Sequence, residues 1–237
     1  GEGVRWAWGE GVLKRPRHAY PLDDRYVLVT DTMNHRIVQV DTQTNRIVWQ
    51  VGREANLQFP RSAHRLDNGH TLIADTGNRR VVEVTTDHTI VWEWDGQGSL
   101  KTPNHCERLA NGNTLVTDWH DHVVLEIDAR GDIAWWYGDA GQSGSGRGLL
   151  HFPEQAMRLE SGRTLIVDGR NDRIIEVDAN AQLKWEYRGT TGARLAWPSA
   201  ARRDIHGHTM IVHRFGKAAL EIDIDGVVLW QGRITPI

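Results

Sequence analysis

The chain has 237 residues, a formal net charge of −3, 25% charged residues and 39% hydrophobic residues. This composition excludes a disordered chain and provides no basic surface for a nucleic acid. No apolar run approaches the roughly 18 residues that a membrane-spanning helix needs, so we expect neither a membrane nor a nucleic-acid partner.

Cys106 is the single cysteine, which excludes an internal disulfide and a cysteine-based zinc site. The chain begins with Gly1 and shows no signal peptide, so it is expected to be a processed or excised form. A single cysteine is compatible with both oxidising and reducing compartments. A periplasmic or extracellular location is preferred over a cytoplasmic one.

Two markers recur along the chain. One is a tryptophan in a short apolar segment, with spacings of 43, 43, 43, 50 and 45 residues: Trp6, Trp49, Trp92, Trp135, Trp185 and Trp230. The other is a proline that opens a P-x-x-(A/C) segment: Pro16, Pro60, Pro103, Pro153 and Pro198. A fixed period of this length predicts a repeat architecture.

Each copy contains four strand-like segments separated by turn residues. In the second copy they are SAHRL, HTLIADT, RRVVEVT and TIVWEW, rich in Val, Ile, Thr and Trp. Four short antiparallel strands per repeat predict an all-β β-propeller, one domain over 1–237. The blades are expected at 16–52, 60–96, 103–138, 153–189 and 198–232, after an orphan outer strand at 3–9.

Ring closure has two solutions. Five blades close with the extra strand at the seam, or the chain supplies most of a six-bladed ring. The five-bladed ring is preferred. An unpaired blade edge is an aggregation hazard, so residues 4–9 are expected to pair, with another chain if not with this one.

Two sets of charged residues fit a structural role. Arginines five residues after the prolines are followed eighteen residues later by glutamates, as in Arg108 and Glu126, and we expect ion pairs within each blade. The alternative is an arginine ring for anions. The aspartates fifteen residues after the prolines (Asp31, Asp75, Asp118 and Asp168) are expected to accept hydrogen bonds from turns, rather than to form a ring of metal ligands.

The segments RLDNGHTLIADTGNRRVVEV and RLANGNTLVTDWHDHVVLEID resemble the repeats of NHL-type propellers. They are also similar to repeats of arylsulfotransferase-like and PQQ-like proteins, notably in IVWEW. The resemblance implies that the first strand of each blade lines a central channel and that ligands bind at its mouth. Such scaffolds host protein binding, RNA binding, lyases and sulfotransferases, so fold alone does not identify the function.

The second and fourth residues after each proline share one strand face. They are His18 and Tyr20, Ser62 and His64, His105 and Glu107, Gln155 and Met157, Ala200 and Arg202. His18, His64 and His105 are therefore candidate ligands of one divalent metal ion, zinc or calcium, as the resemblance to NHL-type lyases allows. Glu107 is a candidate general base, and Arg202 or His213 could polarise a substrate oxygen.

The remaining candidate ligand-binding residues are Gln155 on a first strand and Trp119 and His120 in the unusual turn DWHDHV. A non-catalytic propeller that binds a protein or small ligand at its channel mouth and loop face is the preferred function. The alternatives are a metal-dependent lyase or group-transfer enzyme, and a lectin-like protein that uses Trp8, Trp94 and Trp119.

Overall fold

The computed structural model describes residues 6–215 and 218–233, which form β-strands and short 3₁₀ turns. None of the described residues belongs to a helix long and apolar enough to cross a membrane. The strands of the first two sheets are β1 (His18–Pro21), β2 (Tyr26–Asp31), β3 (Arg36–Asp41), β4 (Arg46–Val51), β5 (Ser62–Arg65), β6 (Thr71–Asp75), β7 (Arg80–Val84) and β8 (Ile90–Trp94).

The later strands repeat this plan. They are β9 (Pro103–Arg108), β10 (Thr114–Asp118), β11 (Val123–Ile127), β12 (Ile133–Tyr137), β13 (Pro153–Arg158), β14 (Thr164–Asp168), β15 (Arg173–Val177), β16 (Leu183–Tyr187), β17 (Gly189–Thr190), β18 (Ala193–Arg194), β19 (Pro198–Arg203), β20 (Thr209–His213), β21 (Ala218–Ile222) and β22 (Val228–Arg233). The 3₁₀ turns are Thr32–Asn34, Thr76–Asn78, Gly96–Gly98 and Gly169–Asn171.

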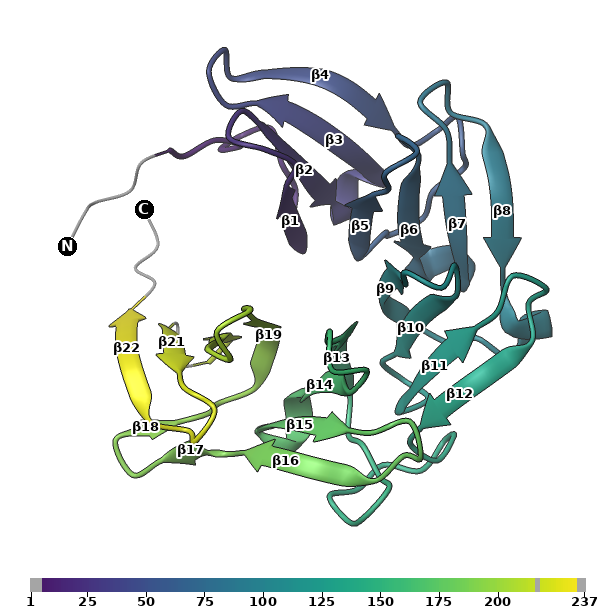
Figure 1. Cartoon of the computed structure of the whole chain (residues 1–237). Coiled ribbons are helices and arrows are strands. Elements are labelled where there is room, and N and C mark those ends of the chain that lie inside the picture. The colour runs from purple at the N-terminus through teal and green to yellow at the C-terminus, as the bar shows by residue number, and fades with distance from the viewer. Residues whose placement is uncertain (1–5, 216–217, 234–237) are drawn as a thin grey trace. The chain divides into compact units, whose positions relative to one another are not determined.

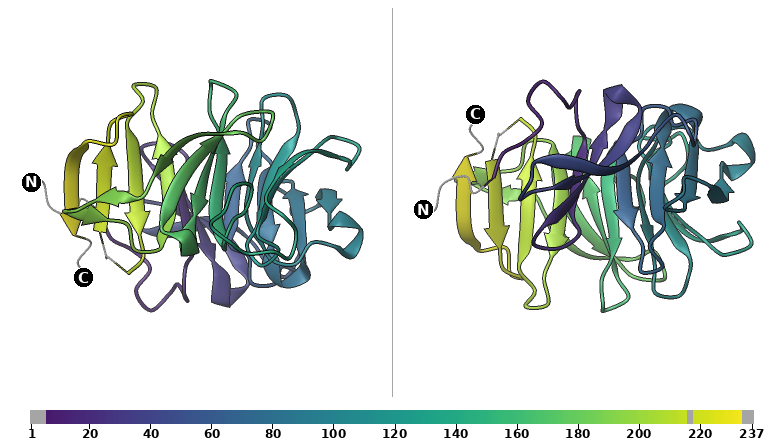
Figure 2. Two further views of the ribbon diagram at one scale, coloured as in Figure 1. Left: turned by 90° about the horizontal axis from the view of Figure 1, so that it is seen from below. Right: turned by 90° about the horizontal axis from the view of Figure 1, so that it is seen from above.

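Five sheets contain four strands each, in sequence order, and β17 and β18 form a separate hairpin (Figure 1). Paired strands run antiparallel, and the connecting turns lie at the strand ends (Figure 2). Each third strand carries a register shift at one equivalent place, for example between Glu83 and Val84 in β7. The predicted all-β propeller with five four-stranded blades is confirmed.

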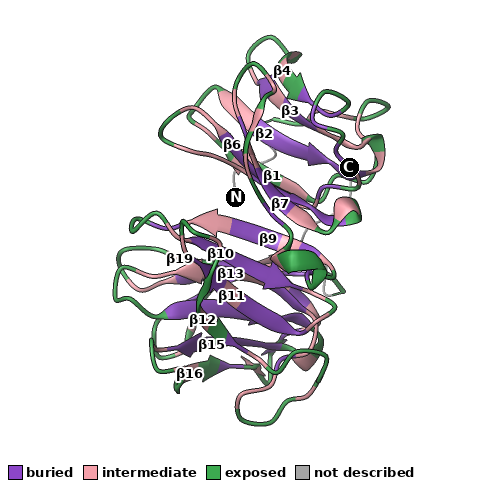
Figure 3. Cartoon of the chain, turned by 90° about the vertical axis from the view of Figure 1, so that its right-hand side faces the viewer, coloured by how far each residue is buried: buried purple, intermediate pink, exposed green. Residues whose placement is uncertain are grey.

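Burial is concentrated on the inner strands of the blades, while the loops are exposed (Figure 3). Every residue of β6, β10 and β14 is buried, because these second strands are covered on both faces. The chain divides into two compact units, Gly1–Arg108 and Leu109–Ile237. The first unit has a core that includes Leu28, Ile73 and Val82, and the second has two such clusters.

The orphan strand expected at 3–9 lies partly outside the described residues. In its described part, Trp6 to Gly9 form no strand. The indole N–H groups of Trp6 and Trp8 instead donate to Oδ1 and the carbonyl of Asn45, at 2.9 and 3.1 Å. Trp8 packs on the cluster of Val29, Val38 and Val40. Side-chain contacts with the first blade, rather than a strand ladder, hold this segment.

The arginine–glutamate pairs join consecutive blades, so the expectation of pairs within a blade was wrong. Arg108 Nη2 donates to Glu83 at 2.7 Å, and Arg158 Nη2 donates to Glu126 at 2.6 Å. Arg203 pairs with Glu176 in the same way, and Arg65 donates to Gln39 at 3.0 Å. From the second blade to the fifth, the first strand therefore presents its arginine to the third strand of the preceding blade.

The same arginines cover the outer-strand tryptophans. Their guanidinium carbons lie 4.6–5.6 Å from the ring centroids in four pairs, Arg65 with Trp49, Arg108 with Trp92, Arg158 with Trp135 and Arg203 with Trp185. Each arginine thus combines an anionic or amide partner with a cation–π contact. These four tryptophans are packing residues between consecutive blades, whereas Trp6 and Trp230 are exposed.

The repeated aspartates are structural acceptors. Asp75, fully buried, accepts from the backbone N–H of Gln58, from Asn78 Nδ2 and from Arg80 Nε. Asp31 and Asp168 have equivalent partners, and Asp118 accepts from the backbone N–H groups of its own turn. Most of these bonds come from side chains and from the loop before the first strand, so the predicted turn bonds account for Asp118 alone.

Candidate functional site

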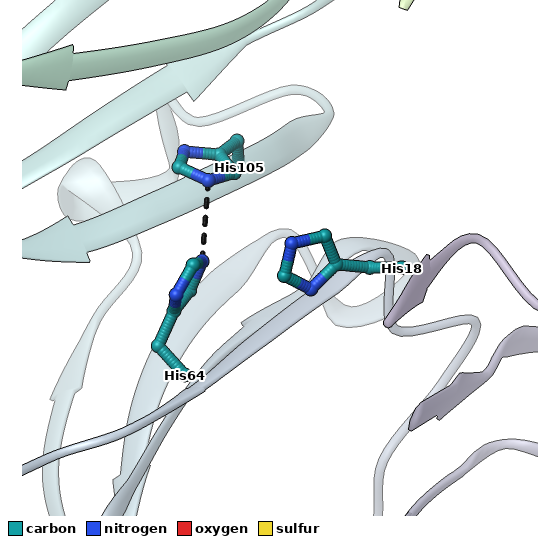
Figure 4. Close-up of side chains that lie close together, drawn as sticks. All are labelled: His18, His64 and His105. Carbon is teal, nitrogen blue, oxygen red and sulfur yellow. Dashed lines mark hydrogen bonds between the residues drawn. The ribbon is translucent and has the colours of Figure 1, made fainter. Parts of the chain in front are cut away.

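Three histidines from three first strands come together in the unit Gly1–Arg108. His18 lies on β1, His64 on β5 and His105 on β9. Side chains two residues apart on a strand share a face, and this alternation turns each imidazole to the same side. The convergence of the three side chains, predicted from their positions after the prolines, is observed (Figure 4).

The ring nitrogens are close enough to share one ion. One ligand atom from each histidine lies within 4.8 Å of the others. The Nε2 atoms of His64 and His105 are 3.2 Å apart, as the dashed line in Figure 4 marks. Two nitrogens on one tetrahedral zinc, each about 2.0–2.1 Å from the metal, are about 3.3 Å apart. The His64–His105 spacing already matches this value, and His18 needs a small inward movement.

The rings also pack on one another. The centroid of His64 is 4.9 Å from that of His18 and 5.0 Å from that of His105, and the rings of His64 and His105 meet edge to face at 81°. The ring of Tyr20 lies 4.9 Å from His64, at 64°. Tyr20 therefore forms one wall of the histidine cluster, which is the term used below for His18, His64 and His105.

Burial keeps the histidine cluster neutral. It lowers the pKa of His18 from 6.5 to about 4, against the opposing effect of a backbone hydrogen bond with Ala63. Burial, followed by repulsion from His18, lowers the pKa of His64 to about 3. The pKa of His105 is well below 6.5, mainly because of burial and then because of the other two rings. Neutral imidazoles are the form that coordinates a metal.

The Nδ1 atom of His105 is buried and has no hydrogen-bond partner among the described residues. The hydrogen bond between His64 and His105 requires one of the two Nε2 atoms to carry a proton. A metal ion bound at the three Nε2 atoms would use their lone pairs and place a proton on each Nδ1, where metal-bound imidazoles usually donate to a further acceptor. The donor set therefore fits a transition metal.

Other first-strand candidates have structural partners. Gln155 Oε1 accepts from the backbone N–H of Ala201 at 3.0 Å, and Ser62 Oγ accepts from Cys106 N–H at 3.2 Å. These polar side chains thus link a blade to the next one. Cys106 is fully buried, and burial raises the pKa of its thiol to about 12, as expected for a small core residue.

The three residues predicted to be catalytic, Glu107, Arg202 and His213, lie outside the group of possible metal ligands. Glu107 is half-buried on β9 and does not belong to the metal-ligating group found among the described residues. Arg202 is exposed on β19. His213 is buried on β20, burial lowers its pKa, and both ring nitrogens are without a partner in the described part of the chain. Arg202 and His213 belong to the unit Leu109–Ile237.

A second cluster of side chains is formed by Trp119, Phe152, Glu154 and Trp197, of which the sequence predicted only Trp119 as a ligand-binding residue. The ring of Trp119 stacks on Phe152 at 4.2 Å, and its indole N–H donates to the buried carboxylate of Glu154 at 3.3 Å. The indole of Trp197 donates to the same oxygen at 2.6 Å. Glu154 and Trp197 directly flank two repeat prolines, at positions where the residues differ between the copies. That variability was the available signal. His120 is exposed beside Trp119.

The lectin-like alternative has little support from these positions. Trp94 is 8% exposed, Trp8 is packed on the first blade, and one ring face of Trp119 is covered by Phe152. An exposed aromatic platform for sugars is thus not formed by these three tryptophans.

No protein-family model matches the sequence, and no curated protein sequence matches it either. Solved structures do match. A streptogramin B lyase structure has a TM-score of 0.70 at 17% identity, covering 93% of this chain and 69% of that one. A protein of unknown function from Bacteroides caccae has a TM-score of 0.71 at 18% identity, covering 91% and 80%.

A further match is the WD40 beta propeller domain of Doa1, with a TM-score of 0.64 at 12% identity, covering 91% and 68%. These neighbours are β-propellers. At such low identity the similarity establishes the fold alone, and the function has to be argued from the site.

Proposed function

We propose that the protein is a metal-binding propeller in which His18, His64 and His105 hold one zinc-like ion and its open coordination position binds a small ligand. The observation that carries this proposal is the convergence of three neutral imidazoles from separate strands, with the Nε2 atoms of His64 and His105 3.2 Å apart. Three nitrogen ligands with a fourth position open to water are typical of zinc sites that bind or activate small molecules.

The donor set also supports the choice of metal. Imidazole suits zinc, copper, nickel and iron, whereas calcium takes oxygen ligands. Three imidazole ligands therefore favour zinc over calcium at this site. The NHL-type resemblance agrees with such a site but does not establish it.

The first test is elemental analysis of protein purified without chelators or a histidine tag, followed by zinc titration of the metal-free protein. We expect about one equivalent of zinc, lost in His64→Gln and His105→Gln. The matched control is His206→Gln, an exposed histidine outside the histidine cluster. The proposal is contradicted if the metal-free wild type takes up no zinc, or if the cluster variants bind zinc as the parent does.

A second candidate function is metal-dependent elimination. It is supported by the open position expected on a three-histidine zinc and by the lyases among the structural neighbours, including an inactive H270A virginiamycin B lyase solved with quinupristin. Zinc-loaded protein and its His105→Gln variant should be incubated with quinupristin and followed by chromatography. Conversion by the wild type alone supports this candidate, and its absence leaves the binding function as the proposal.

A further inference from the structure

A cavity of about 560 Å3 lies in the unit Gly1–Arg108, beside the end of β4 and the loop that follows it. This volume is within the range of small-molecule sites. Its polar lining side chains include Asn34, His35, Arg36, Gln50, Arg53 and Gln58. None of them belongs to the histidine cluster, so the cavity is a separate feature of the molecule.

Arg36 in the cavity lacks the glutamate partner that the equivalent arginines of two other blades have. In the second blade, Arg80 Nη1 donates to the carboxylate of Glu93 at 3.0 Å, and in the fourth blade Arg173 Nη1 donates to Glu186 at 3.1 Å. In the first blade the same atom of Arg36 faces an amide, Gln50 Oε1, at 3.1 Å. The strand registers are equivalent, since Gln50, Glu93 and Glu186 each pair with the middle of the third strand.

The arginine and the carboxylate are otherwise kept or lost together. The third blade has Val123 and Trp136 at these two positions, and the fifth has Ala218 and Gln231. Only the first blade retains the arginine without the carboxylate. The Arg36 side chain is also more exposed, at 25%, than Arg80 at 14% and Arg173 at 4%.

The remaining lining favours an anionic group. Arg36 uses Nε for the buried carboxylate of Asp31, at 2.8 Å, which leaves its Nη1 toward Gln50. Arg53 is exposed and adds a second guanidinium. His35 Nδ1 accepts from the backbone N–H of Phe59, so a neutral His35 carries its proton on Nε2 as another donor. Glu54 contributes one carboxylate to the lining, and it accepts from Gly52 N–H.

Amides complete the lining. Asn56 and Gln58 each offer an amide donor and an amide acceptor, the combination that suits hydroxyl groups, and Gln50 adds an amide donor. We propose that this cavity binds a small hydroxylated carboxylate such as a sugar acid. Its carboxylate displaces the Gln50 amide oxygen from Arg36 Nη1 and takes the position that Glu93 and Glu186 occupy in their blades, while its hydroxyls contact the amides.

The test is calorimetric titration with D-glucuronate, D-glucose and acetate, in the presence of a chelator. We expect saturable binding of glucuronate, with glucose and acetate at least tenfold weaker. Gln50→Glu supplies the missing carboxylate from the protein and should weaken glucuronate binding at least tenfold, as should Arg53→Gln. Gln231→Glu adds the same charge at the equivalent position of the fifth blade and should bind like the parent.

Circular dichroism and the thermal midpoint of each variant establish that the fold is retained. Absence of saturable glucuronate binding to the wild type overturns the proposal, and so does parental affinity in Gln50→Glu. Acetate that binds as tightly as glucuronate overturns the assignment of hydroxyl contacts. His64→Gln should bind glucuronate normally, which separates the result from that of the zinc test.

Discussion

Arg108 Nη2 lies 2.7 Å from Oε2 of Glu83, a residue of the preceding blade, and the two side chains are only 21% and 13% exposed. Glu83 also contacts His70 within its own blade, with 2.7 Å between Nδ1 and Oε1. Glu83 thus takes part in one interaction between blades, with Arg108, and in one within its own blade, with His70. Removing the ion pair tests how neighbouring blades hold each other.

Arg108→Ala should lower the free energy of unfolding by about 1–3 kcal/mol, because it leaves a mostly buried carboxylate with one partner fewer and uncovers Trp92. Urea unfolding gives the measurement. Adding Glu83→Gln should recover part of the loss, whereas adding Glu126→Gln should not. Coupling of Arg108 to Glu126 instead of Glu83 would contradict the pairing between blades.

Metal-free protein should lose stability in acid through the histidine cluster. Burial lowers the folded-state pKa of His18 to about 4 and of His64 to about 3, while the unfolded chain has ordinary values near 6.5. The unfolded state therefore binds protons first as the pH falls. The contribution is complete above pH 6.5 and is lost as the pH falls through the folded values, at up to about 1.4 kcal/mol per pH unit for each histidine.

Denaturant unfolding at pH 7.5, 5.5 and 4.5 measures this loss. His64→Gln removes one titrating group and should give a shallower dependence than the parent over the same range. The exposed His206→Gln should retain the parental slope. Equal slopes for all three proteins would mean that the histidine cluster does not titrate as its burial requires.

Zinc should stabilise the folded protein, because the three ligands converge only when the blades are folded. At a free concentration one hundredfold above the dissociation constant, a ligand specific for the folded state adds about 2.7 kcal/mol. Thermal or urea unfolding with and without zinc measures the gain. His105→Gln should abolish it, and calcium at the same concentration should have no effect on the wild type.

Gly169→Ala should lower the free energy of unfolding by about 1–3 kcal/mol, because the added methyl group would crowd the side chains around Glu154. A Cβ at Gly169 would lie 2.8 Å from Glu154 Cγ, 3.1 Å from the carbonyl of Phe152 and 3.2 Å from Trp197 Nε1. Gly192→Ala is the matched control, since nothing lies within 4 Å of its Cβ and its φ is not left-handed. We expect that control to be neutral or stabilising by about 0.4–1 kcal/mol. Similar thermal midpoints for the two variants would refute the steric argument.

Much of the fold could be read from the sequence because each repeat carries its own strand and turn signals. The spacing of the prolines and tryptophans predicted the five blades, and strand alternation placed His18, His64 and His105 on one face. Both depend on local geometry. That these histidines bind a metal remains a prediction.

Contacts between repeats were harder to predict. Arg108 stands in the same register relative to Glu83 of one blade and Glu126 of another, and in-register comparison cannot distinguish the two. Glu154 was missed for a related reason. Its carboxylate is stabilised by Trp119, 35 residues away, and Trp197, 43 residues away, so variation between the copies marks the position but does not identify its partners.

Because each of the arginines that join consecutive blades contacts the preceding blade, the segment of chain that keeps all its contacts is not the same as the four-stranded blade. The compact unit Gly1–Arg108 ends on Arg108 itself, one strand past the second blade. Glu83 and Trp92 thereby keep their cover within that unit. A gene segment that is duplicated or exchanged without exposing a carboxylate and an indole should therefore run from second strand to first strand. The self-contained repeat, in which these contacts are kept, is thus a circular permutation of the four-stranded blade.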